Sequence, residues 1–174
     1  GTSQVAQVFA SQCVITEKPK TMRISVNGAL SKNVLPKDVI LYIIAQLGTN
    51  SGTGYFIEYA GDVFENMSME GRMTVCNMSI EMGARGGMIA PDETTFNYIK
   101  ERKFAPKGID FTKKVQSWKQ LKTADDAIFD AEFTFDAQDI APMITYGTNP
   151  GMGIKITEEI PSTKNDSFEK SLRY

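Results

Sequence analysis

The sequence predicts an α/β fold, a layered domain in which helices pack on a small sheet. Strand-like and helix-like patterns alternate along its 174 residues, and this order is typical of layered α/β domains. The length suits one domain, or one domain with pieces of its neighbours. Hydrophobic residues make up 41% and charged residues 23% of the chain, which is the composition of an ordinary globular protein.

The first third of the chain predicts two helices and two strands. A helix is expected from about Gln4 to Gln12, with Ser3 as its N-cap. Thr21–Asn27 alternates apolar and polar residues, as a half-buried strand does. Pro36–Leu47 is the clearest helix, because proline suits the first helical position and an apolar stripe follows it. A glycine-rich turn then leads to a short strand at Tyr55–Tyr59.

The last part of the chain predicts two more helices and one more strand. These are a helix from Glu93 to about Arg102, a helix at Phe111–Leu121 and a strand at Ala127–Phe135. Asp92 and Asp110 suit the N-cap positions of the two helices. We expect residues 139–153 to be irregular because prolines and glycines interrupt them, and Glu158–Tyr174 to be a polar linker.

Between these parts, Ser68–Pro91 predicts a buried helix, a glycine-rich turn and a short strand. Successive helical residues are about 100° apart, so apolar side chains spread over most of this helix. A helix that is apolar almost all round is normally buried. The apolar side chains are Met69, Met73, Val75, Cys76, Met78, Ile80 and Met82.

A polar strip runs along the same predicted helix. Thr74, Asn77 and Glu81 are spaced by three and four residues, and Glu70 joins them if the helix begins that early. A buried carboxylate or amide needs a partner, because an unpaired buried charge is very unfavourable. Spacing alone favours hydrogen bonds to a neighbouring turn; the alternative is that the strip faces a polar pocket.

Several kinds of site are excluded for this chain alone. It has no histidine, and its two cysteines, Cys13 and Cys76, cannot assemble a four-ligand zinc or iron–sulfur site. Two buried thiols are the simpler interpretation. The net charge of -2, without a block of like charge, argues against a nucleic-acid partner. No apolar run approaches the roughly 20 residues of a membrane span, and we expect a cytoplasmic protein.

Three hypotheses about function remain open on the residues alone. The chain could be an enzyme fragment that contributes Asn77 and Glu81 to a site completed elsewhere. It could instead be a structural or interaction domain, or a small-molecule binding module that uses its glycine-rich turns. The chain opens Gly-Thr-Ser without a methionine and runs directly into a helical pattern, so we expect it to be a segment of a longer protein.

Stretches from nearly the whole chain resemble the aconitase superfamily. They are GTSQVAQVFASQ, LPKDVILYIIAQLG, GTGYFIEYAG, SMEGRMTVCNMSIEMGARGGMIAPDETTFNYI and YGTNPGMG. The fourth stretch is specific, because an unrelated α/β domain is not expected to contain it. The chain is most similar to the 3-isopropylmalate dehydratase (isopropylmalate isomerase) large subunits within this superfamily, and homoaconitase is the nearest rival.

The resemblance implies a lyase of leucine biosynthesis that isomerises 2-isopropylmalate and 3-isopropylmalate by dehydration and rehydration. A [4Fe–4S] cluster held by three cysteines would bind this hydroxy-diacid through its fourth iron. A small subunit would be the partner and would supply a serine as the base. Neither nucleic acid nor membrane is implied.

The resemblance also implies a role for two residues of the polar strip. Asn77 would hydrogen-bond near the cluster, and Glu81 would orient cluster-bound solvent or a catalytic histidine, both without ligating iron. Cys76 would not be a ligand. The family's GDSHT-like motif is expected before Gly1 and its cluster cysteines after Tyr174, so the segment alone is expected to be inactive and to bind no cluster.

The resemblance finally implies a division into three parts. Residues 1–20 would end a preceding domain, residues 21–137 would form a second α/β domain, and residues 138–174 would connect it towards a third domain.

Overall fold

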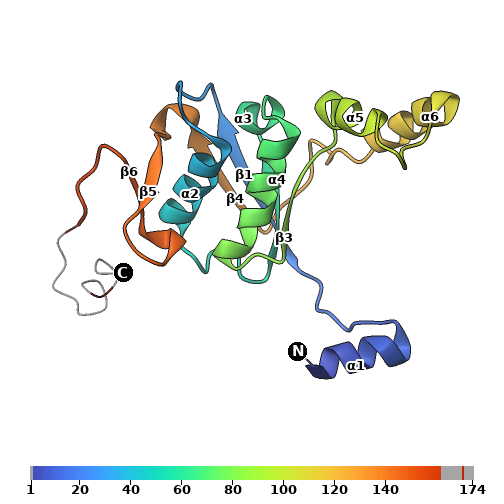
Figure 1. Ribbon diagram of the computed structural model, residues 1–174, viewed down its shortest axis with the longest axis horizontal. Coiled ribbons are helices and arrows are strands. Elements are labelled where there is room, and N and C mark those ends of the chain that lie inside the picture. The colour runs from blue at the N-terminus through green and yellow to red at the C-terminus, as the bar shows by residue number, and fades with distance from the viewer. Residues whose placement is uncertain (1, 162–169, 171–174) are drawn as a thin grey trace.

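The structure, a computed structural model, describes residues 2–161 and 170 and confirms the predicted α/β class (Figure 1). Its centre is a four-stranded parallel sheet with the strand order β3-β2-β1-β4. In β1, Ile24 pairs with Tyr59 of β2 on one side and with Phe133 of β4 on the other. The strands are β1 (Lys20–Asn27), β2 (Tyr55–Ala60), β3 (Gly86–Ile89) and β4 (Ala131–Asp136).

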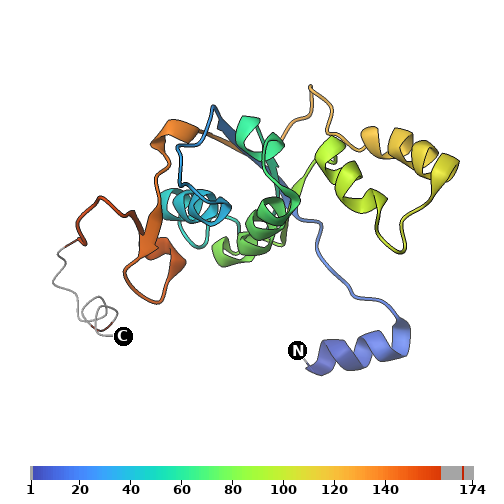
Figure 2. The same ribbon diagram turned by 45° about the horizontal axis from the view of Figure 1, so that its top comes forward.

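Helices cover one face of this sheet and also extend beyond it. α2 and α4 lie side by side over the strands, α5 and α6 project past the edge strand β3, and α1 lies apart (Figures 1 and 2). The helices are α1 (Thr2–Ser11), α2 (Pro36–Leu47), α3 (Asp62–Glu65), α4 (Met69–Met78), α5 (Glu93–Lys100) and α6 (Gly108–Lys119). No helix in the part of the chain that the structure describes is long and apolar enough to cross a membrane.

Shorter elements complete the fold. They are the 3₁₀ turns η1 (Ser79–Met82), η2 (Ala137–Asp139) and η3 (Pro150–Met152), and the antiparallel hairpin of β5 (Met143–Thr145) and β6 (Gly153–Lys155). The hairpin packs against α2, on the side of α2 away from α4 (Figure 1).

The core lies between the sheet and α2 and α4. Alternate residues of β1 point into it, as the period of two predicts, and the other residues of β1 are half-buried or exposed. α2 contributes its whole apolar stripe. The buried residues that make this layer are Met22, Ile24, Val26, Val39, Ile40, Ile43, Ile44, Ile57, Tyr59, Val75 and Met82.

Three predictions of local structure were wrong. α1 begins at Thr2, so Ser3 lies within it instead of capping it. The helix predicted from Phe111 begins at Gly108, because the backbone N–H of Asp110 already bonds the carbonyl of Lys107 and is part of the first turn. Residues 139–153 contain β5 and the first residue of β6, and strands of three residues are too short to produce a periodic pattern.

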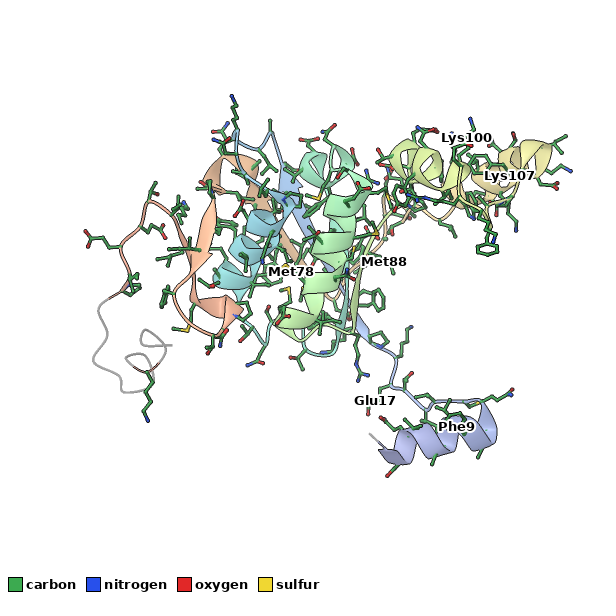
Figure 3. The ribbon with its side chains drawn as sticks, viewed as in Figure 1. Phe9, Glu17, Met78, Met88, Lys100 and Lys107 are labelled. Atoms are coloured by element: carbon green, nitrogen blue, oxygen red, sulfur yellow. The ribbon has the colours of Figure 1, made fainter. Side chains whose placement is uncertain are left out.

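Two further stretches differ from their predictions. β4 begins at Ala131 instead of Ala127, because the side chain of Asp130 accepts the backbone N–H of Thr21 at 2.7 Å before the ladder starts. α5 ends at Lys100; the Lys107 ammonium donates to the carbonyls of Lys100 and Arg102 and closes the connection to α6 (Figure 3). The linker predicted at Glu158–Tyr174 falls mostly outside the described residues.

A buried guanidinium joins α4 to its neighbours. Arg72 is 3% exposed, and its two terminal nitrogens donate to the two carboxylate oxygens of Asp92 at 2.7 and 2.6 Å. Its remaining donors reach the carbonyls of Glu65 at 2.8 Å and Met67 at 3.1 Å. Asp92 also caps α5 by accepting the backbone N–H of Thr95 at 3.1 Å. One side chain therefore fixes α3, α4 and the start of α5 relative to one another.

We predict that Asp92→Asn lowers the free energy of unfolding by roughly 2–3 kcal/mol. Asparagine still caps α5, so the substitution isolates the loss of charge beside the buried Arg72. Urea unfolding would measure the change. Glu93→Gln is the matched control because it breaks the exposed pair of Glu93 with Lys119, and it should change stability by less than about 1 kcal/mol. Equal effects of the two substitutions would contradict the prediction.

The same pair predicts sensitivity to acid. Burial raises the pKa of Asp92, but hydrogen bonds from Arg72 and from the backbone N–H of Thr95 lower it by more. The pKa of Asp92 therefore lies below its ordinary value. The stabilisation is therefore present above the ordinary aspartate pKa of about 4 and is lost as the pH falls through the lowered value. The stability difference between the wild type and Asp92→Asn should be constant from about pH 5 to 7 and shrink in stronger acid. A difference that persists at about pH 2 would contradict this.

Candidate functional site

The helix predicted to be buried all round is buried on one side only. Ser68 caps α4 by accepting the backbone N–H of Gly71 at 3.2 Å. Met73 and Ile80, predicted to lie on a buried face, are 41% and 67% exposed. The prediction was wrong because the sheet and the neighbouring helices α2 and α5 cover only part of this helix, and the rest of its surface faces outward. The buried side consists of Gly71, Arg72, Val75, Ser79 and Met82.

A buried hydroxyl pair holds the junction of α4 and η1 against the sheet. The Tyr59 hydroxyl lies 2.8 Å from Ser79 Oγ, which donates to the carbonyl of Val75 at 3.2 Å. Burial raises the pKa of Tyr59, which keeps the phenol protonated. A Cβ on Gly87 would come within 2.4 Å of Ser79 Oγ and 3.2 Å of Cys76 Cα, so glycine is required where β3 passes under this junction.

The polar strip faces outward. Thr74 is half-buried and donates its hydroxyl to the carbonyl of Glu70 at 2.9 Å within the same helix. Asn77 and Glu81 are both exposed. The expectation that these two side chains are buried was therefore wrong, and neither needs a partner within this chain to avoid a desolvation penalty. Their exposure leaves them free to contact another molecule or another part of a longer protein.

Glu81 borders a surface hollow of about 270 Å³ that joins three distant stretches of sequence. α2 contributes Lys37 and Leu41, and the end of α4 and η1 contribute Met78 and Glu81. Figure 3 labels Met78 in the space between α2 and α4. The loop after β5 closes the hollow with Thr145, Gly147, Thr148, Asn149 and Pro150. Asn77 is one helical turn before Glu81 and is not part of this lining.

The loop is held in place by a buried carboxylate that the sequence interpretation missed. Asp38 is 8% exposed; one of its oxygens accepts the backbone N–H of Leu35 at 2.7 Å and the other accepts that of Met143 at 2.9 Å. It therefore caps α2 and anchors β5 to the same end of the helix. An acidic residue three positions after the N-cap residue is a recognised capping signal, so the first bond has a local signal. The bond to Met143 spans 105 residues and has no local signal.

The far end of the loop is fixed by its own turn. The Asn149 side-chain oxygen accepts the backbone N–H of Gly151 at 2.8 Å and caps η3. A Cβ on Gly151 would lie 3.0 Å from the side chain of Thr49, which follows α2. The hollow therefore has two fixed sides. One is the wall of Lys37, Leu41 and Glu81, and the other is the loop of residues 145–150.

The hollow combines a cation, a carboxylate and hydroxyl groups over an apolar floor. Leu41 is buried and Met78 is half-buried, whereas Lys37, Glu81, Thr145 and Thr148 are exposed at its rim. An apolar surface with a few convergent polar groups is the usual composition of a small-molecule site. This arrangement can bind a small polar molecule and exchange hydrogen bonds or a proton with it.

The residues of this chain do not by themselves fit an iron–sulfur cluster, which needs three thiolates. Cys13 is exposed, contrary to the expectation of two buried thiols, and Cys76 is half-buried on α4. Burial raises the pKa of the Cys76 thiol, although Arg72 opposes this effect. Within residues 2–161 and 170, no group of three or more histidine, cysteine or acidic side chains lies close enough to hold a metal ion.

Comparison with known proteins finds relatives along the whole chain. The chain is 66% identical to the 3-isopropylmalate dehydratase large subunit of Flavobacterium johnsoniae, 61% identical to that of Phocaeicola vulgatus and 51% identical to that of Roseiflexus castenholzii. Each comparison covers all of this chain but only 38–39% of the relative. The model of the aconitase family (aconitate hydratase) matches residues 1–174. Because that match includes every residue, the chain belongs to the aconitase family.

Proposed function

We propose that this chain is part of the large subunit of a 3-isopropylmalate dehydratase. The complete enzyme would isomerise 2-isopropylmalate and 3-isopropylmalate by dehydration and rehydration, in leucine biosynthesis. The supporting observation is that relatives over 50% identical along the whole chain share this name. Their common name favours this substrate over the homocitrate of homoaconitase. The chain spans about two fifths of their length, so the activity is inferred for the longer protein.

In this proposal, Asn77 and Glu81 form one wall of the active site. Both residues are exposed and lie near the junction of α4 and η1, which the Tyr59–Ser79 hydrogen bond anchors to the sheet. The Glu81 carboxylate, at the rim of the hollow, would accept or return a proton or orient a neighbouring catalytic group. The Asn77 amide would donate and accept hydrogen bonds beside it. The [4Fe–4S] cluster expected in the family would supply Lewis-acid chemistry when bound, with its ligands outside this chain.

The other members of the assembly follow from the same proposal. A small subunit would pair with the large subunit and complete the site, and the enzyme would be cytoplasmic. Residues 1–20, which include the separate helix α1, would end a preceding domain, and residues 21–137 would be the second domain. Residues 138–174 would connect to a third domain, with their hairpin packed against α2 on the way.

We predict that Glu81→Gln in the complete enzyme lowers the turnover of 2-isopropylmalate by about 100-fold or more, because the variant cannot take up a proton. The free energy of unfolding should change by less than about 0.5 kcal/mol, since Glu81 is exposed. Turnover and urea unfolding would be measured on the same preparations. Glu101→Gln, which removes another exposed carboxylate at the end of α5, is the control and should leave both values unchanged.

The outcome separates a functional from a structural role. Unchanged turnover in Glu81→Gln would contradict the proposed wall, and a parallel loss of stability would indicate that Glu81 supports the fold instead.

We also predict that the 174-residue chain alone holds no intact cluster and does not turn over isopropylmalate, because it offers only Cys13 and Cys76 as thiolates. Iron and sulfide would be counted after anaerobic reconstitution, with the complete large subunit treated in parallel. Stoichiometric iron with isomerase activity in the chain alone would overturn the prediction.

A further inference from the structure

The hollow beside Glu81 contains a cation that nothing in the described residues neutralises. Lys37 is exposed and is the second residue of α2, where the helix dipole disfavours a positive charge. The ion pairs formed within residues 2–161 and 170 are Arg23–Glu58, Arg72–Asp92 and Lys119–Glu93, and none includes Lys37. The neighbouring Asp38 is unavailable, because both of its oxygens accept backbone N–H groups. The charge of Lys37 therefore has no ion-pair partner among the described residues and is available to a ligand in the hollow.

The surroundings of Lys37 define the chemistry of that ligand. Leu41 lies one turn further along the same side of α2 and forms an apolar floor with Met78. The hydroxyl group of Thr148 and the carboxylate of Glu81 lie at the rim. A molecule with a carboxylate for the ammonium, a hydroxyl for the polar rim and an aliphatic part for the floor would match this arrangement.

We propose that Lys37 binds a carboxylate of the hydroxy-diacid substrate, an inference that rests on the proposed function. Lysine acts here as a point charge at the end of a long side chain, so it can meet a carboxylate without the planar geometry that arginine requires. Asp38 supports this role indirectly, since it holds both the first turn of α2 and the strand that carries the opposing loop. Lys37 is thus a substrate-binding residue, and Asp38 is a positioning residue.

The test is the equilibrium affinity of the complete large subunit, assembled with its small subunit, for 2-isopropylmalate. Lys37→Met should raise the dissociation constant tenfold or more, which is the usual effect of losing a hydrogen bond to a charged group. Lys37→Arg, which keeps the charge, should recover most of the affinity. Lys32→Met, on the exposed loop before α2, is the matched control and should bind as the wild type does. The melting temperature of Lys37→Met should be unchanged or higher, because the unfavourable interaction with the helix dipole is removed.

Two results would overturn the proposal. An affinity of Lys37→Met within about twofold of the wild type would show that Lys37 does not bind the substrate. A wild-type protein that does not bind 2-isopropylmalate would have the same consequence.

Turnover of the wild type separates this proposal from the proposed function. If the wild type isomerises 2-isopropylmalate and Lys37→Met binds it with unchanged affinity, only the proposed role of Lys37 is contradicted. If the wild type binds 2-isopropylmalate without isomerising it, and Lys37→Met loses this binding, only the proposed reaction is contradicted.

Discussion

The rest of the structure depends on the buried guanidinium of Arg72. Its contacts with Asp92 and with two backbone carbonyls leave it one orientation, towards the interior where α3, α4 and α5 meet. Because residues on a helix advance by about 100°, Asn77 lies about 140° around the helix from Arg72. Burial of Arg72 therefore requires Asn77 to face outward. The internal ion pair thus selects which residues of α4 are available for function.

The site is assembled from segments that only the fold brings together. Two neighbouring parallel helices, α2 and α4, provide one wall, and a hairpin more than 60 residues later in the chain provides the other. The hollow lies beside η1, which leads into the amino end of β3. Ligands of open parallel sheets usually bind outside the carboxyl ends of the strands. Glu81 therefore lies towards the opposite ends of the strands, whereas Lys37 lies in the first turn of α2, which follows the carboxyl end of β1.

The polar groups that stabilise the fold and those of the candidate site are separated in this molecule by their exposure. Arg72, Asp38 and Ser79 are buried, and each is fully occupied with internal hydrogen bonds. Lys37, Asn77 and Glu81 are exposed and contribute little to the core. Unpaired charges are tolerated at the surface, where water solvates them, and are excluded from the interior, where nothing does.

By itself, the sequence determined the α/β class, β1, α2 and the family, because alternation, an apolar stripe and conspicuous motifs are local properties of the chain. Only the tertiary structure decided which side of α4 is buried, since apolar residues spread over most of that helix and the sheet, α2 and α5 cover only part of it. It also decided the positions of Arg72 and Asp38, whose partners lie 20 and 105 residues away. Local sequence patterns indicate which faces of an element can be buried. Long-range packing decides which of those faces is buried, and the faces left exposed line the candidate site.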